Sequence, residues 1–217
     1  MKVAVFAGTP KDSQMGQDIL IENNFEARKF FLADSPKEQS RLQYYSKDML
    51  EKKFKNLSRQ ALSWGAEKFF IYCNSLSAAL DVKRLSKELD IQIISPFDVY
   101  ENLDEKYKNI FILAANALAA YKEDEILSKT FHRNIISMGN LSIVENIEVD
   151  TPAEEIIEKL NLKGLMNYIN NIKDEKYKIQ AIILGCTHFP YLKDELKKYT
   201  SIDIIDPATE MIKLLKN

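Results

Sequence analysis

Residues 69–77 read FFIYCNSLS and residues 182–190 read IILGCTHFP, so one order of residue types occurs twice in the chain. In each segment, a short apolar run leads into a cysteine and then into small polar residues. A short apolar run is typical of a buried strand, and small polar residues favour the start of a helix. Each segment therefore predicts a strand, a cysteine at its carboxyl end and a helix that begins just beyond.

Short apolar runs alternate with longer amphipathic segments along the rest of the chain. This alternation is typical of parallel sheets with helices on both faces. Residues 50–61 have apolar side chains at helical spacing and lead to a stop at Gly65, and two further helices are expected within residues 152–172. The predicted strands are Val3–Phe6, Ala27–Phe31, Phe69–Tyr72, Ile91–Ile94, Ile110–Leu113, Ile135–Met138, Ala181–Leu184 and Ile202–Ile205.

Two prolines mark the expected boundaries between two compact units. Pro96 comes just after the fourth predicted strand and Pro207 just after the last, and proline biases the preceding residue away from helix. The 217 residues are 46% apolar, which is enough to bury a substantial core. The expected first α/β unit is residues 1–95 plus 207–217, which carries Cys73, and the second is residues 96–206, which carries Cys186.

The composition argues against several kinds of partner. Lysine and arginine total 30 against 32 acidic residues, so the net charge of −2 provides no attraction to nucleic acid or to an anionic membrane. The first apolar run is too short for a signal peptide, and no stretch approaches a membrane span of roughly 18 residues. We therefore expect a cytoplasmic protein with free thiols. Two cysteines and two histidines, far apart in the sequence, predict no structural metal site.

The two cysteines suit a reaction at the α-carbon of an amino acid. Ligands of open α/β sheets bind at the carboxyl ends of the strands, where a helix that starts there offers free backbone N–H groups. Inversion of the α-carbon needs one protonated and one deprotonated group, and a thiol with a pKa of about 8.5 can serve as either. Cys73 and Cys186 are the candidates, with His188 as a possible proton partner. The alternative is that both cysteines are only small buried side chains.

Residues 184–192 (LGCTHFPYL) resemble the second catalytic motif of the aspartate/glutamate racemase family, and residues 73–75 resemble the first, which usually reads Cys-Asn-Thr. Further similarities lie at residues 3–16, 110–115 and 205–208. The resemblance implies two similar lobes related by a pseudo-twofold axis, with the active site between them. It also implies a racemase without pyridoxal phosphate or metal, which acts on a small acidic amino acid, glutamate or aspartate, and forms a homodimer.

The resemblance assigns roles to individual residues. Cys73 and Cys186 would be the two bases of the proton transfer, and His188 would support Cys186. The substrate carboxylate and amino groups would be bound by residues beside the cysteines and in the loop after the first strand. The expected substrate-binding residues are Gly8, Thr9, Asp12, Ser13, Asn74, Ser75 and Thr187.

Three segments depart from the family pattern. Residues 7–16 read AGTPKDSQMG in place of an Asp-Ser-Gly loop, so Asp12 and Ser13 take its role only in a shifted alignment. The segment after the second strand lacks a Pro-Tyr-Gly, and Lys37 or Arg41 there is either a surface charge or a ligand for a distal carboxylate. Residues 116–118 (NAL) replace a segment with Gly and Thr, which removes a hydroxyl group. These departures concern the substrate more than the chemistry.

Two other functions stay open on the sequence alone. A decarboxylase or dicarboxylate isomerase of the same superfamily would use one cysteine as proton donor or nucleophile, whereas this chain retains both cysteines and His188. A non-catalytic protein could keep the fold and bind an acidic amino acid. An active racemase exchanges the α-proton with solvent, and a binding protein does not.

Overall fold

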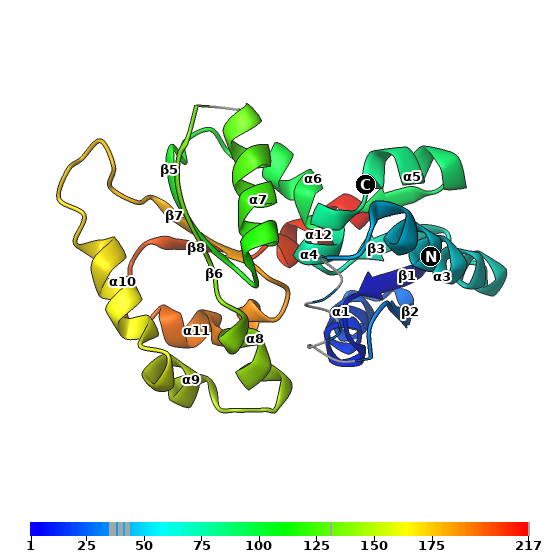
Figure 1. The fold of residues 1–217 in the computed structure, drawn as a ribbon, viewed down its shortest axis with the longest axis horizontal. Coiled ribbons are helices and arrows are strands. Elements are labelled where there is room, and N and C mark those ends of the chain that lie inside the picture. Colours follow the sequence, from blue (N-terminus) through cyan, green and yellow to red (C-terminus); the bar gives the residue numbers. More distant parts are fainter. Residues whose placement is uncertain (35–37, 39–40, 42–43, 131, 217) are drawn as a thin grey trace. The chain divides into compact units, whose positions relative to one another are not determined.

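The computed structural model describes residues 1–34, 38, 41, 44–130 and 132–216. The chain divides into two compact units, one of Met1–Val99 with Ala208–Asn217 and one of Tyr100–Pro207. Each unit has its own four-stranded parallel sheet flanked by helices (Figure 1). The predicted fold class, two similar α/β lobes with mostly parallel sheets, is confirmed. None of the described helices is long and apolar enough to cross a membrane.

The sheet of the first unit has the strand order β2-β1-β3-β4. A cluster of buried aromatic rings stabilises it, in which Phe6 of β1 packs against Phe30, Phe54 and Phe69 with ring centroids 4.8 to 5.4 Å apart. The strands are β1 (Lys2–Ala7), β2 (Glu26–Phe31), β3 (Lys68–Ile71) and β4 (Gln92–Ile94). The helices are α1 (Pro10–Glu22), α3 (Lys47–Trp64), α4 (Asn74–Ala79), α5 (Val82–Leu89) and, at the two boundaries with the second unit, α6 (Pro96–Glu101) and α12 (Pro207–Lys216).

The sheet of the second unit has the strand order β6-β5-β7-β8. Its central strands are fully buried, as expected for parallel strands with helices on both faces. Helix α7 covers one face, and α8 to α11 lie on the other (Figure 1), where they pack against Phe111, Leu113 and Ile182. The strands are β5 (Asn109–Ala114), β6 (Asn134–Gly139), β7 (Ala181–Gly185) and β8 (Asp203–Ile205). The helices are α7 (Ala117–Thr130), α8 (Leu141–Glu148), α9 (Ala153–Lys159), α10 (Leu162–Asn170), the 3₁₀ turn η1 (Phe189–Leu192) and α11 (Lys193–Leu196).

The two sheets have the same topology. In each unit the first strand lies between the second and the third, so the direction of winding reverses between the first and third strands. In open parallel sheets, such a reversal opens a crevice at the carboxyl ends of the strands, where ligands bind. The loops after β1 and β3 flank this position in the first unit, and the loops after β5 and β7 flank it in the second.

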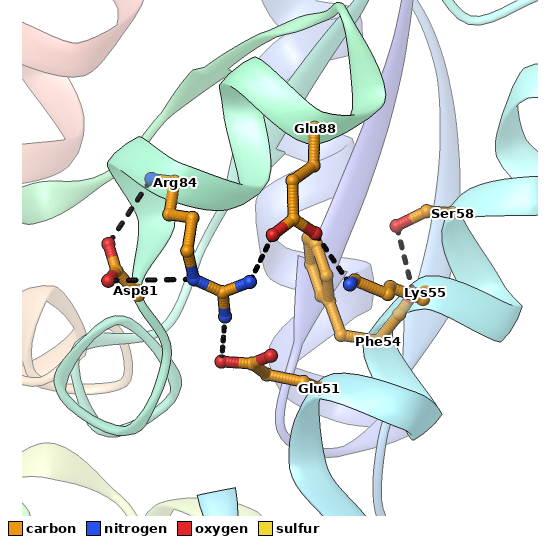
Figure 2. A network of polar contacts seen from close by, with 7 residues as sticks. All are labelled: Glu51, Phe54, Lys55, Ser58, Asp81, Arg84 and Glu88. Carbon is orange, nitrogen blue, oxygen red and sulfur yellow. Dashed lines mark hydrogen bonds and ion pairs between the residues drawn. The ribbon is translucent and has the colours of Figure 1, made fainter. Parts of the chain in front are cut away.

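A charged network joins α3 to α5 on the surface of the first unit (Figure 2). Arg84 of α5 contacts Glu51 of α3 and Glu88 of its own helix, and Lys55 Nζ lies 2.6 Å from Glu88 Oε2. Hydrogen bonds from Lys55 and Arg84 lower the pKa of Glu88. Because every charge drawn in this network has an opposite charge beside it, we interpret it as a link between two helices and not as a ligand site.

Candidate active site

Cys73 lies just beyond the end of β3 and forms the N-cap of α4. Its backbone is extended, and its Sγ accepts a hydrogen bond from the N–H of Leu76 at 3.4 Å. Cys73 forms no disulfide bond, and the residue is only 3% exposed. A backbone N–H that points at the sulfur favours negative charge there. The local structure therefore suits a cysteine that gains and loses a proton.

Asn74 and Ser75 are the first two residues of α4, directly beside Cys73. Asn74 is buried and Ser75 is half-buried. Ser77, one turn further on, donates a hydrogen bond from Oγ to the Cys73 carbonyl at 2.9 Å. The structure thus places the three residues of the predicted first motif together, on a helix start that is fixed by hydrogen bonds.

The loop after β1 reaches the same sheet edge as Cys73, because β1 is paired with β3. Thr9 is the N-cap of α1 and its Oγ1 accepts a hydrogen bond from the N–H of Asp12 at 3.1 Å. Asp12 Oδ2 in turn accepts from the N–H of Gly8 at 3.3 Å, and Ser13 donates to the Pro10 carbonyl at 2.9 Å. Gly8, Thr9, Asp12 and Ser13 are all buried. The predicted residues of this loop therefore lie together and bond to one another.

Cys186 follows β7, the strand that is equivalent to β3 in the second unit. It is a free thiol and 6% exposed. Its Sγ lies 3.7 Å from Nδ1 of His188, and Nε2 of His188 lies 2.7 Å from Oε1 of Glu148. His188 is fully buried. When Glu148 accepts the Nε2 proton, the Nδ1 nitrogen faces the sulfur as a proton acceptor. A carboxylate, an imidazole and a thiol therefore form one chain of contacts.

Sequence reasoning did not find Glu148. It is the last residue of α8 and lies 40 positions before His188, in a segment without a recognisable motif. Only the packing of α8 beside η1 brings its carboxylate to the histidine. The one signal available was His188 itself, since a buried histidine needs a hydrogen-bond partner.

The sequence prediction was wrong about the segment after Cys186. A helix capped by small polar residues was expected there, as after Cys73. Thr187 and His188 instead form a turn, and a short 3₁₀ turn begins at Phe189 without a side-chain cap. Pro190, the second residue of that turn, has no N–H. Thr187 is nevertheless buried directly beside Cys186.

The remaining departures concern Asn116, Lys37 and Arg41. Asn116 follows β5, and its Oδ1 accepts the N–H of Ala119 at 3.0 Å, so its side chain bonds to the start of α7. Arg41 is exposed. Lys37 lies outside the described residues, so a role of either cation at a distal carboxylate stays a prediction. In the described part of the chain, no group of three or more His, Cys, Asp or Glu residues could hold a metal ion.

Comparison with known proteins places this chain in a family. A family model described as Asp/Glu/Hydantoin racemase matches residues 25–215, which include both cysteine segments. The chain belongs to the Asp/Glu/Hydantoin racemase family. The resemblance carried by the two cysteine motifs is thereby confirmed.

Individual members of the Asp/Glu/Hydantoin racemase family show how far the similarity extends. A glutamate racemase of Clostridium perfringens (strain SM101 / Type A) is 27% identical over 158 residues, which are 70% of this chain and 58% of the relative. The match thus spans less than two thirds of that relative. The glutamate racemase of Francisella tularensis in complex with D-glutamate has a TM-score of 0.69 at 20% identity, over 99% of this chain and 79% of the other. For the aspartate racemase of Picrophilus torridus, the TM-score is 0.63 at 17% identity, over 99% and 94%. These two structures share the fold.

Proposed function

We propose that this protein is a cofactor-independent amino-acid racemase that inverts the α-carbon of glutamate or aspartate, with Cys73 and Cys186 as its two acid/base groups. One observation carries the proposal: each unit places one buried thiol, outside any disulfide, just after its third strand, at the carboxyl edge where its sheet reverses direction. Two equivalent thiols are suited to a reaction that removes a proton from one face of a carbon and returns a proton to the other.

The proposed reaction needs one thiolate and one thiol. The thiolate takes the α-proton of one enantiomer and becomes a thiol, and the electron pair of the broken C–H bond is delocalised into the substrate carboxylate. The other cysteine then gives its S–H proton to the opposite face of the carbon and becomes a thiolate. The product is the other enantiomer, and the two cysteines have exchanged their protonation states. The same steps in reverse convert the product back.

His188 and Glu148 support Cys186 in this proposal. The 2.7 Å contact with Glu148 orients the imidazole, and Nδ1 is the nitrogen next to the sulfur. His188 can then accept the proton of Cys186 or return it between turnovers. Cys73 has a different environment, a backbone N–H donor on its sulfur. The two halves of the proposed site are therefore equivalent in position and unlike in chemistry.

Substrate binding is assigned to the polar groups around the two thiols. Asn74 and Ser75 beside Cys73, and Thr187 beside Cys186, would bind the α-carboxylate and the α-amino group. Gly8 and Thr9 would add backbone and hydroxyl groups from the loop after β1. Asp12 and Ser13 bond within that loop, so we propose that they shape it as well as contact the substrate.

Relatives named glutamate racemase and a structural neighbour named aspartate racemase make these two amino acids the first substrates to test. The protein is incubated without added cofactor with each pure enantiomer, and the enantiomer ratio is followed by chiral chromatography. Loss of optical purity for one pair supports the proposal. Saturable binding in calorimetry without loss of optical purity would instead indicate a binding protein. A homodimer is also proposed, and analytical ultracentrifugation tests it.

A further inference from the structure

Helix α7 carries a buried carboxyl group that the proposed reaction does not use. Glu123 is 0% exposed, and neither of its carboxyl oxygens has a hydrogen-bond partner among the described residues. A buried carboxyl without a partner forfeits its hydrogen bonds to water and gains none in return, so such groups are rare in folded proteins. Its position therefore requires an explanation.

The carboxyl group of Glu123 lies against Gly185, the residue just before Cys186. A Cβ atom built on Gly185 would lie 2.8 Å from Cδ and 3.0 Å from Oε1 of Glu123, and closer still to Oε2. These three atoms of one side chain are the nearest that such a Cβ would meet. Side chains of a helix tilt toward its N-terminus, and α7 begins at the carboxyl edge of the sheet. Glu123 therefore points back toward the end of β7 and occupies the space where residue 185 would have a side chain.

The surroundings of Glu123 are acidic. Burial raises the pKa of Glu123 well above its ordinary value. Tyr100 is also fully buried, and its pKa is raised by burial and by the negative charges of Glu123, Asp206 and Cys186. Tyr100 from α6, Asp206 after β8 and Cys186 after β7 thus belong to one cluster with Glu123. In its protonated form, Glu123 fills this space without adding negative charge beside the thiol.

We propose that Glu123 is a positioning residue for Cys186: its side chain packs on Gly185 and thereby fixes the backbone from which the thiol extends. A role for Glu123 in catalysis rests on the proposed function. The contact between Glu123 and Gly185 does not, because both residues lie within the second unit. Truncation of Glu123 would leave a space beside Gly185, and the Gly185–Cys186 peptide would be free to shift into it.

The direct test measures the reactivity of Cys186 without any amino-acid substrate. The chain has two cysteines, so in a Cys73→Ser background the alkylation of cysteine by iodoacetamide, identified by mass spectrometry of the Cys186 peptide, reports on Cys186 alone. The rate is followed from pH 6 to 10 with Glu123 intact, with Glu123→Ala and with Glu123→Gln, which keeps the shape. Glu125→Gln on the same helix is the matched control, because Glu125 pairs with Lys122 and Lys129 at the surface. Cys73 in a Cys186→Ser background is the second control.

We expect Glu123→Ala to change the alkylation rate of Cys186 by fivefold or more, and Glu123→Gln to change it by less than twofold. The alkylation rate of Cys73 should not change when Glu123 is truncated, and the alkylation rate of Cys186 should not change with Glu125→Gln. Glu123→Ser makes the same truncation and replaces Glu123→Ala if that variant does not fold. An unchanged rate–pH profile in the truncated variant, or an equal change at Cys73, overturns the proposal.

A second comparison tests the contact with Gly185. Gly185→Ala alone should lower the unfolding midpoint, and Glu123→Ala should restore it, because the three atoms nearest to the new methyl group belong to Glu123. Equal effects of Gly185→Ala with and without Glu123 would contradict the contact.

If the enzyme is active, Glu123→Ala should lower kcat by roughly 10- to 100-fold and change KM by less, as expected from misplacement of a reacting group. Activity absent from the unaltered protein would count against the proposed function, whereas the alkylation result would still decide the role of Glu123.

Discussion

Cys73 and Cys186 differ in their immediate partners, a backbone N–H for one and a histidine for the other. The motif around each cysteine was visible in the sequence, and so was His188, because these residues are consecutive in the chain. Glu148 and Glu123 were not predicted. Each is a single glutamate on a helix without a motif. The packing of α8 beside η1 brings Glu148 to the cysteine segment, and the packing of α7 on the sheet brings Glu123 there.

The two-thiol mechanism predicts the effect of replacing either cysteine. Cys73→Ser and Cys186→Ser should each lower racemisation by at least about 100-fold, because a serine hydroxyl replaces one of two non-redundant acid/base groups. Both variants should unfold at temperatures near that of the unaltered protein. Chiral chromatography measures the activity and circular dichroism the unfolding. Full turnover by either variant would contradict the mechanism.

Glu148 gives a second prediction. Glu148→Gln should lower kcat by roughly 10- to 100-fold, since the amide no longer fixes the charge and the tautomer of His188. His188→Asn should have a similar effect, and the double variant should be little worse than either single one, because the two residues act as a unit. Steady-state kinetics in both directions provide the measurement. Additive losses in the double variant would show that the two residues act independently.

Among the elements, strands were easier to predict than the segment after Cys186. All eight predicted strands are present. The reason is clearest for β5 and β7, because a parallel strand with helices on both faces is buried and apolar along its whole length. The helix that was expected to end at Gly65 also ends there. The segment after Cys186 differs because its polar residues, Thr187 and His188, precede a 3₁₀ turn that contains Pro190. A local pattern therefore predicts the end of a strand better than the structure of the next segment.

Gly65 allows a prediction about α3. Its φ of +88° lies in the left-handed region, and its N–H bonds to the carbonyls at the end of the helix. Gly65→Ala should lower the free energy of unfolding by about 1 to 2 kcal/mol, because a Cβ is disfavoured in this conformation. Gly65→Asn should lose less, since asparagine tolerates it better. Chemical denaturation of the three proteins tests the order, and an alanine variant as stable as the original would contradict it.

The whole molecule repeats one topology in two units, which the sequence indicated only through the two cysteine segments. The order of strands within each sheet could not be predicted, because it depends on contacts between segments far apart in the chain. The shared order matters for function, since it places each cysteine after an equivalent strand.

The pH dependence of stability belongs to the whole molecule as well. Ion pairs lower the pKa of Glu125 to about 2 and that of Glu88 below its ordinary value, so their contributions are lost as the pH falls below about 4.5. Burial raises the pKa of Glu123, so its contribution is present at low pH and is lost as the pH rises from about 4.5 toward the pKa of the folded state.

We therefore expect Glu123→Gln to flatten the loss of stability between pH 5 and 8 and to leave the acid limb unchanged. Glu125→Gln should flatten the loss of stability below about pH 4.5 and leave the slope between pH 5 and 8 unchanged. Thermal unfolding midpoints measured from about pH 2 to 8 report both effects. If the slope between pH 5 and 8 is the same with and without Glu123, the carboxyl is not held in its protonated form by burial.

The most direct test of the two-thiol racemase follows the α-proton itself. Pure L- and D-glutamate and L- and D-aspartate are each incubated with the reduced, folded protein in D₂O without cofactor, and NMR follows deuterium at the α-carbon while chiral chromatography follows the enantiomer ratio. The account predicts that for one of the two amino acids the product enantiomer carries deuterium at the α-carbon and both enantiomers are converted. Absence of deuterium from all four compounds after prolonged incubation would contradict it.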